Sequence, residues 1–180
     1  QVIKMLRPKP ILLILGAGGH GQSVAEAAEL SGEWADIIFA DDRWPSNGAV
    51  SKFKIVSNIS QIKFLDKSGV LAITAVGNNQ LRSQWNKKLM ELSIPLATII
   101  HPNTIISPTA IIGHGVAIMA GCVVGTHSQI GNGAILNIGT LLDHDVLVDE
   151  YAHLSVGVKV AGGKKISQYS FLEVGTIITH

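Results

Sequence analysis

The second half of the chain is built from hexapeptides. Counting in sixes from Ile100 to Ile178, every sixth residue is Ile, Leu or Val, fourteen times without interruption. An α-helix has 3.6 residues per turn and a flat strand alternates in twos, so neither explains this period. A period of six is typical of a parallel β-helix, in which short strands and corners alternate and each coil stacks on the previous one.

A second position of each hexapeptide supports the same fold. The residue four places after each aliphatic is mostly small or β-branched, and Lys164 is the exception. It lies two residues before the next aliphatic, so both side chains point inward from one strand. The three residues between them then form a corner.

The composition narrows the class of protein. The net charge is +1 and neither Lys nor Arg forms a run, so nucleic-acid binding and polybasic membrane binding have little support. Charged residues make up 15% of the chain, against roughly 25% in ordinary soluble domains, so we expect apolar surface that another chain covers. The single cysteine excludes an internal disulfide framework, and Cys122 occupies an inward position where a packed, inert thiol is expected.

The chain ends and the apolar segments suggest where the protein resides. No apolar stretch is long enough to span a bilayer, and residues 1–10 lack the apolar core of a secretory signal, so we expect a cytoplasmic protein without membrane insertion. The chain starts with Gln rather than Met and stops in mid-hexad. We therefore expect residues 1–10 to be a disordered or artificial tail, 11–98 to form an α/β domain, and 99–180 to form a β-helix truncated at its C-terminus.

A glycine-rich turn follows the first expected strand. The apolar run Ile11–Leu15 is typical of a buried parallel strand, and the glycines of residues 16–21 separate it from an expected helix at 22–30. Free backbone N–H groups and the helix dipole make such a turn an anion-binding site. Gly16, Gly18 and Gly21 match the spacing G-x-G-x-x-G.

An acidic pair lies where a nucleotide would need it. The expected strand 36–40 ends in Asp41 and Asp42, about twenty residues after the glycines, where a carboxylate accepts ribose hydroxyls. Further along the chain we expect a third strand at 70–76, a turn that contains Gly77, and a helix at 80–92. Fewer than ninety residues hold about one mononucleotide half of a dinucleotide fold, so the region predicts a mononucleotide such as UDP. NAD binding, and a tight turn without any ligand, remain alternatives.

One histidine stands out as a candidate catalytic base. His144 lies at an expected corner between Asp143 and Asp145, either of which could hold one imidazole N–H, fix the tautomer and raise the basicity. If three hexapeptides make one coil, residues eighteen apart stack on successive coils, which would put Gly162 above His144, with Gly163 beside it. We expect these glycines to leave a notch for substrate next to the imidazole.

A second histidine, His153, is expected to point outward from a strand. Its column contains Ala117, Ile135 and Phe171, and a histidine in an apolar stripe is usually packed in an interface. A whole strand separates His153 from the corner of His144, so two subunits could bring them together more easily than one. A neighbouring outward column is also apolar and predicts a homotrimer with active sites between subunits; it consists of Ile105, Val123, Leu141 and Ile177.

Three motifs ahead of the hexapeptides resemble those of a known family. Gly-Ala-Gly-Gly-His-Gly, Phe-Ala-Asp-Asp and Val-Gly-Asn-Asn-Gln-Leu-Arg, followed by hexapeptides, resemble the nucleotide-4-amino-sugar N-acetyltransferases of the PglD/NeuD type, among the hexapeptide-repeat acyltransferases. The resemblance covers the chain from Ile11 onward. It implies a Rossmann-like α/β domain followed by a left-handed, three-sided β-helix with three hexapeptides per coil.

The resemblance also implies roles for particular residues. His144 would be the general base in acetyl transfer from acetyl-CoA to the amine of a UDP- or GDP-linked amino-sugar, a reaction of glycan or polysaccharide biosynthesis. His153 and Val174 would contact acetyl-CoA, with Gly162 nearby. The residues implied to hold the nucleotide-sugar are Gly18, Gly19, His20, Asp41, Asp42 and Gly77.

Other functions remain open from the sequence. O-acetylation of a sialic-acid-like sugar is one alternative, and a catalytically weak trimer that binds or senses nucleotide-sugars is another. Trimeric left-handed β-helices also include zinc carbonic anhydrases, which need a close histidine pair on one coil. His144 and His153 are nine residues apart on different faces, so we expect no metal site.

Overall fold

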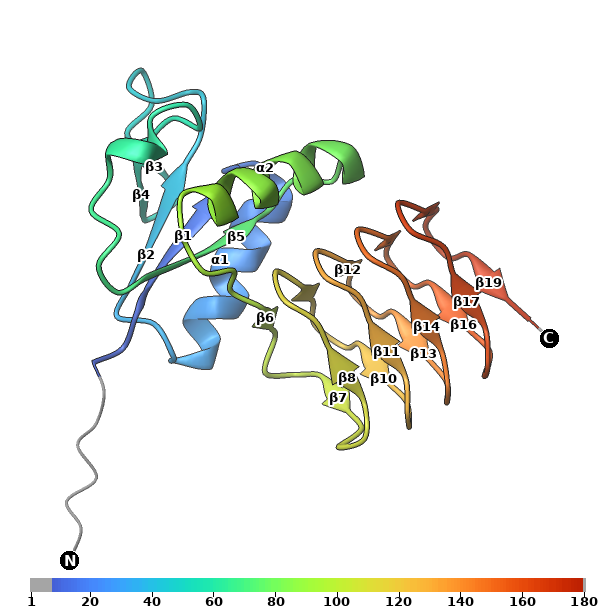
Figure 1. Cartoon of the computed structure of the whole chain (residues 1–180). Helices are drawn as coiled ribbons and strands as arrows, with labels where there is room; N and C mark the ends of the chain where they lie inside the picture. Colours follow the sequence, from blue (N-terminus) through green and yellow to red (C-terminus); the bar gives the residue numbers. More distant parts are fainter. Residues whose placement is uncertain (1–7, 180) are drawn as a thin grey trace, which may run out of the picture.

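The computed structural model describes residues 8–179 and shows two parts, an α/β sheet region and a stack of short parallel strands (Figure 1). Residues 1–7 of the expected tail lie outside the described residues. The remainder of that tail is not separate from the fold, because the carbonyl of Pro10 accepts a hydrogen bond from the N–H of Ala35 at 2.8 Å. Within 8–179 neither helix is long and apolar enough to cross a membrane.

The first part is a five-stranded sheet in the order β3-β4-β2-β1-β5. All neighbouring strands are parallel except β3 and β4, and β1 lies between β2 and β5. Leu12 and Leu13 of β1 point to opposite faces and both are buried, because each face is covered. The elements are β1 (Ile11–Leu15), α1 (Gly19–Ser31), β2 (Asp36–Ala40), β3 (Ala49–Val50), β4 (Phe53–Ser57), η1 (Ile62–Phe64), β5 (Val70–Thr74) and α2 (Asn79–Glu91).

The second part confirms the β-helix predicted from the hexapeptides. Fourteen two-residue strands form three parallel sheets, in the orders β19-β16-β13-β10-β7, β17-β14-β11-β8 and β18-β15-β12-β9-β6, which are the three faces of a left-handed prism. Strands eighteen residues apart pair in register, as Val123 does with Leu141. The strands are β6 (Ile99–Ile100), β7 (Ile105–Ile106), β8 (Ile111–Ile112), β9 (Ala117–Ile118), β10 (Val123–Val124), β11 (Gln129–Ile130), β12 (Ile135–Leu136), β13 (Leu141–Leu142), β14 (Leu147–Val148), β15 (His153–Leu154), β16 (Lys159–Val160), β17 (Lys165–Ile166), β18 (Phe171–Leu172) and β19 (Ile177–Ile178).

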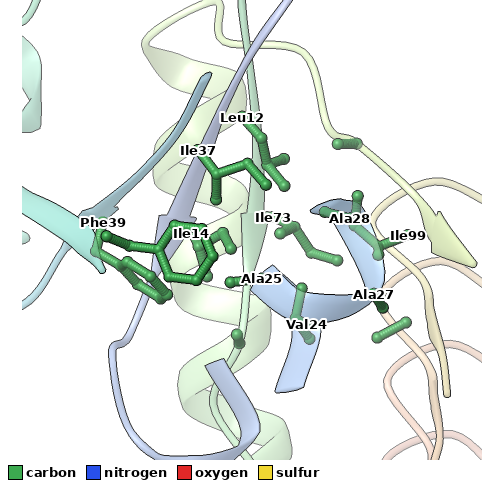
Figure 2. Packing of buried hydrophobic residues seen from close by; sticks show 14 of the residues in the cluster. Leu12, Ile14, Val24, Ala25, Ala27, Ala28, Ile37, Phe39, Ile73 and Ile99 are labelled. Atoms are coloured by element: carbon green, nitrogen blue, oxygen red, sulfur yellow. The ribbon is translucent and has the colours of Figure 1, made fainter. Parts of the chain in front are cut away.

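The same chain covers most of the column of His153, and only Phe171 at its end is exposed, at 51%. We expected this outward stripe to be packed at an interface, and its cover is the chain's own N-terminal part. Ile99, Ala117 and Ile135 belong to one buried cluster with Ala27 and Ala28 of α1, and Figure 2 shows Ile99 beside these alanines. The two parts of the chain therefore share a hydrophobic core, and the face of β9, β12 and β15 is buried within the subunit.

The other outward column differs from the expected apolar stripe. Lys159 lies in register between Leu141 and Ile177, so a charged residue interrupts the stripe. The column is contiguous and apolar only over Ile105, Val123 and Leu141. Ile105 is 70% exposed, so this face still offers apolar surface to another chain.

Candidate functional site

The glycine turn leaves an open helix N-terminus. Gly18 is the N-cap of α1 without a side-chain cap, and the first turn carries no acidic residue. No atom lies within 4 Å of where a Cβ at Gly18 or Gly19 would be. Gly21 is different, since a Cβ there would overlap the carbonyl oxygen of Gly16, so this glycine permits the close packing of α1 on the turn. The free N–H groups of the first turn can therefore hold a phosphate.

The two acidic residues both have internal partners. Asp41 accepts a hydrogen bond from the Ala17 N–H at 2.8 Å and pairs with Arg43, whose Nε lies 2.6 Å from Oδ1. The Arg43 guanidinium and the Ala17 N–H lower the pKa of Asp41 to about 2. Asp42 accepts from the N–H of Ile59 at 3.2 Å. Asp41 thus shapes the glycine turn itself, a role that its position after β2 did not reveal.

His20 and His153 meet where the two parts of the chain join. Their ring centroids are 6.5 Å apart. The Nδ1 of His153 lies 3.3 Å from the carbonyl oxygen of Gly77, and Phe171 contacts the ring edge-on. Burial lowers the pKa of both histidines, that of His20 to about 4, so both are neutral at neutral pH. Within residues 8–179 neither Nε2 has a hydrogen-bond partner although both atoms are buried, as expected for a site that completes its hydrogen bonds with a ligand.

His144 lies at the exposed corner between β13 and β14. Its Nδ1 is 2.7 Å from Oδ2 of Asp145, while its Nε2 is 3.9 Å from Oδ2 of Asp143. Asp143 instead accepts the backbone N–H of His144 at 2.8 Å. Asp145, and then Asp143, raise the pKa of His144 by stabilising the imidazolium. With Nδ1–H donated to Asp145, the neutral ring carries its lone pair on Nε2, as a general base requires.

Gly162 does not leave a notch beside the imidazole as we expected. The His144 ring itself occupies the space, since a Cβ on Gly162 would lie 2.5 Å from Nε2 and 2.6 Å from Cε1. Gly163 has φ +69° and no atom within 4 Å of its missing Cβ. Gly162 therefore seats the imidazole, and its assignment to acetyl-CoA stays a prediction.

The coil before His144 supports its corner, a contribution that the sequence analysis missed. The hydroxyl of buried Ser128 donates to the Asp143 carbonyl at 2.8 Å and accepts the Val146 N–H at 3.0 Å. A Cβ on Gly125 would lie 2.6 Å from the Asp143 carbonyl, so only glycine fits there. Counting back eighteen residues from 143 and 146 would have identified both positions.

Arg82 is a further residue that the sequence analysis missed. This residue of α2 is fully buried against the β-helix corner at Gly133 and Tyr151. It also donates to the carbonyls of the turn at Val76 and Gly77. Buried arginines are rare. Arg82 closes the motif Val-Gly-Asn-Asn-Gln-Leu-Arg that carries the family resemblance, but the sequence analysis assigned it no role.

The structure does not bring the candidate residues into one site within a subunit. His144 follows β13 of one sheet, whereas His153 belongs to β15 of another and faces the N-terminal part. Val174, 68% exposed, lies at the corner between β18 and β19. Gly18, Gly19, His20, Asp41 and Gly77 all lie on the side of His153.

Two further observations concern the cysteine and the residue types that bind metals. Cys122 is buried, as expected, and burial raises the pKa of its thiol. Across the described part of the chain, no three His, Cys, Asp or Glu side chains are close enough together to hold a metal ion.

Comparison with known proteins places this geometry in a family. Residues 11–89 match the PglD N-terminal domain. Over 112 residues the chain is 30% identical to UDP-N-acetylbacillosamine N-acetyltransferase of Bacillus subtilis, a match that covers 59% of this chain. It spans about half (50%) of that relative's length.

Solved structures match almost the whole chain. The acetyltransferase domain of PglB from Neisseria gonorrhoeae, in complex with acetyl coenzyme A, is 35% identical with a TM-score of 0.90, over 94% of this chain and 82% of that one. A histidine-to-alanine variant of GDP-perosamine N-acetyltransferase from Caulobacter crescentus, in complex with CoA and GDP-perosamine, is 29% identical with a TM-score of 0.80, over 93% and 88%. The chain therefore belongs to the PglD/NeuD-type family of hexapeptide-repeat acyltransferases.

Proposed function

We propose that the protein transfers the acetyl group of acetyl-CoA to the amine of a UDP- or GDP-linked amino-sugar. The observation that carries this proposal is the His144–Asp145 pair, whose 2.7 Å contact leaves Nε2 free as a base at an exposed corner. The similar structures that contain acetyl coenzyme A, or CoA with GDP-perosamine, support the choice of both substrates. We place the reaction in the cytoplasm, where acetyl-CoA and nucleotide-sugars are made.

The reaction needs no covalent enzyme intermediate. The amine nitrogen attacks the thioester carbonyl carbon while Nε2 of His144 takes one amine proton. The tetrahedral intermediate then breaks its C–S bond, and the protonated His144 returns the proton to the CoA thiolate. The buried thiol of Cys122 does not enter these steps.

The open N-terminus of α1 suits the diphosphate of a nucleotide-sugar. Gly18 and Gly19 would bind the phosphates through backbone N–H groups, and His20 would contact the same substrate. Asp42 and Gly77 follow β2 and β5, the two strands that flank β1, and Asp41 holds the turn in shape. The buried Nε2 atoms of His20 and His153 are the groups that a bound substrate would satisfy.

We further propose a homotrimer in which each site takes His144 from one subunit and His153 from its neighbour. The separation of these histidines on different sheets within one chain supports this arrangement. Beside Asp143, an open groove of about 480 Å³ runs along β10, β13, β16 and β19, which suits the long arm of acetyl-CoA. Val174 and Gly162 would line the path of that arm.

A thiol-release assay over a panel of UDP- and GDP-linked amino-sugars tests the activity. We expect CoA release only with sugars that carry a free amine, and mass spectrometry should find the acetyl group on nitrogen. His144→Ala should lower the rate by about a hundredfold or more without loss of fold, because the side chain lies at an exposed corner. Equal transfer to sugars without an amine would favour O-acetylation, and no release with any sugar would favour a trimer that only binds nucleotide-sugars.

A further inference from the structure

Arg82 is a buried charge whose hydrogen bonds all go to uncharged oxygens. Its Nε donates to the Gly133 carbonyl at 2.7 Å, and its Nη1 to the carbonyls of Val76 and Gly77 at 2.9 and 3.4 Å. Its Nη2 donates to Oδ1 of Asn79 and to the Tyr151 carbonyl, at 2.8 and 2.9 Å. All five guanidinium N–H groups are thus used, which is the full donor capacity of arginine.

A buried charge without a counter-ion is an expensive way to join two parts of a chain. Well-packed apolar residues could join them at lower cost. The pKa of Arg82 is lowered to about 10 by burial, so the group is still charged at neutral pH. The chain therefore retains a desolvated cation at this point, and the positions of its acceptors suggest the reason.

The acceptors of Arg82 lie on both sides of His153. The Tyr151 carbonyl is two residues before His153 on the β-helix. The Gly77 carbonyl, on the N-terminal side of the joint, is also the oxygen 3.3 Å from Nδ1 of His153. One rigid guanidinium thus fixes the strand that carries the imidazole and the oxygen that the imidazole contacts.

We propose that Arg82 is the positioning residue that holds His153 in its Nδ1–H tautomer, an inference that rests on the proposed acetyl transfer. A carbonyl oxygen only accepts, so while Gly77 stays in place Nδ1 must carry the proton. The buried Nε2 is then an acceptor without a partner inside the described chain. It accepts one hydrogen bond from an N–H or O–H of the bound substrates, which fixes how they lie against His153.

Arg82→Lys tests this proposal, because lysine keeps the charge but has three donors instead of a planar fork. We expect kcat to fall about tenfold or more, since small displacements of a positioning group have effects of this size. The long-range ¹⁵N–¹H NMR pattern of His153 should change from a single Nδ1–H tautomer to an average of two. This spectrum is recorded without substrate. It therefore tests the role of Arg82 even if the wild type acetylates no sugar and the proposed function fails.

Ser83→Ala is the matched control. Ser83 neighbours Arg82 on α2 and joins the same two parts of the chain, with its Oγ 3.0 Å from the Tyr169 hydroxyl. Within residues 8–179 its side chain makes no hydrogen bond to Gly77 or His153. It should keep the wild-type tautomer and kcat within about twofold, as expected of a partly exposed hydrogen bond. The proposal is overturned if Arg82→Lys keeps the single tautomer, or if Ser83→Ala disturbs it equally.

A second variant covers the case in which Arg82→Lys does not fold. Asn79→Ala keeps the guanidinium, removes one of its five acceptors and also removes the Nδ2 hydrogen bonds to the carbonyls of Tyr169 and Ser170, so partial tautomer averaging is expected. A wild-type spectrum for Asn79→Ala would overturn the proposal. It is overturned as well if neither variant folds while Ser83→Ala does, because Arg82 would then serve folding alone.

Discussion

A single methyl group at Gly162 should displace His144, the proposed base, while leaving its imidazole chemically unchanged. A Cβ at this position would lie 2.5 Å from Nε2 of His144, whereas ordinary contacts begin at 3.4 Å. The imidazole must therefore move by about 1 Å, a displacement that can cost about a hundredfold in rate. Because the ring lies at an exposed corner, it can swing away from Asp145 at little cost to the fold.

The stability of Gly162→Ala should stay close to that of the wild type. Alanine is strained in the left-handed region of backbone conformation, and Gly162 does not lie in that region. Replacing glycine by alanine at such positions changes stability by about 1 kcal/mol or less. A loss of activity in Gly162→Ala would thus reflect the displaced imidazole and not unfolding.

Gly163→Ala is the matched control, in which we expect the stability to fall and the activity to stay. Its φ of +69° makes alanine strained, yet no atom lies within 4 Å of the new Cβ. It should lose about 1–2 kcal/mol of stability and keep its activity. Steady-state thiol release gives kcat and KM for acetyl-CoA, and thermal unfolding gives the stability.

The pH profile separates displacement of the base from a loss of acetyl-CoA binding. Asp145 raises the pKa of His144 above 6.5, so the acidic limb of kcat/KM in the wild type lies above that value. In Gly162→Ala the contact with Asp145 is broken, and the limb should move down toward 6.5. A kcat above half of the wild-type value, with an unchanged limb, would refute the reasoning.

Two further predictions concern the proposed nucleotide site and the proposed subunit interface. Asp41→Asn should weaken nucleotide-sugar binding in calorimetry and leave acetyl-CoA binding unchanged; it should also remove a stabilisation that the wild type has above pH 4 and loses as the pH falls toward about 2. Val123→Glu should give monomers or aggregates in light scattering, because three buried like charges cost several kcal/mol. Val123 is a better choice than Leu141, whose neighbour Lys159 could pair with an introduced glutamate, and a wild type that is already monomeric would end this argument.

The sequence predicted the elements whose pattern is local. The hexapeptide period predicts the strand and the corner, so the β-helix follows from counting. The stacking by eighteen follows once the family resemblance adds three hexapeptides per coil. Strands β1 and β2 begin and end where their apolar runs do. Both helices begin earlier than predicted. For α1 the prediction left out residues 19–21, because Gly19 and Gly21 have poor helix propensity. For α2 it left out Asn79, because Asn78 was not identified as the N-cap.

What the sequence did not predict depends on contacts between distant segments. Which prism face the N-terminal part covers is a property of tertiary packing, and no period in the chain encodes it. The stacking rule correctly placed Gly162 next to His144. It did not predict that the imidazole fills the space beside Gly162, because the rule does not fix the orientation of the His144 ring. Short strands such as β3 carry too few residues for any pattern to emerge.

The separation of the two histidines leads to a test that needs no structure of the assembly. If the proposed homotrimer forms and each site needs both side chains, His144→Ala and His153→Ala subunits should each be inactive alone. Suppose each site lies between two neighbouring subunits, one supplying His144 and the other His153. A site in a mixed trimer is then intact when the first subunit is the His153→Ala variant and the second is the His144→Ala variant.

Random mixing of equal amounts of the two variants makes about one site in four intact. Refolding them together should therefore restore about a quarter of the wild-type rate, once native mass spectrometry shows that the subunits have exchanged. Sites contained within single subunits predict no recovery, since no chain in the mixture carries both histidines. Exchanged trimers that stay inactive would assign both histidines to one subunit, which their places on β15 and at the corner after β13 make difficult for a rigid prism.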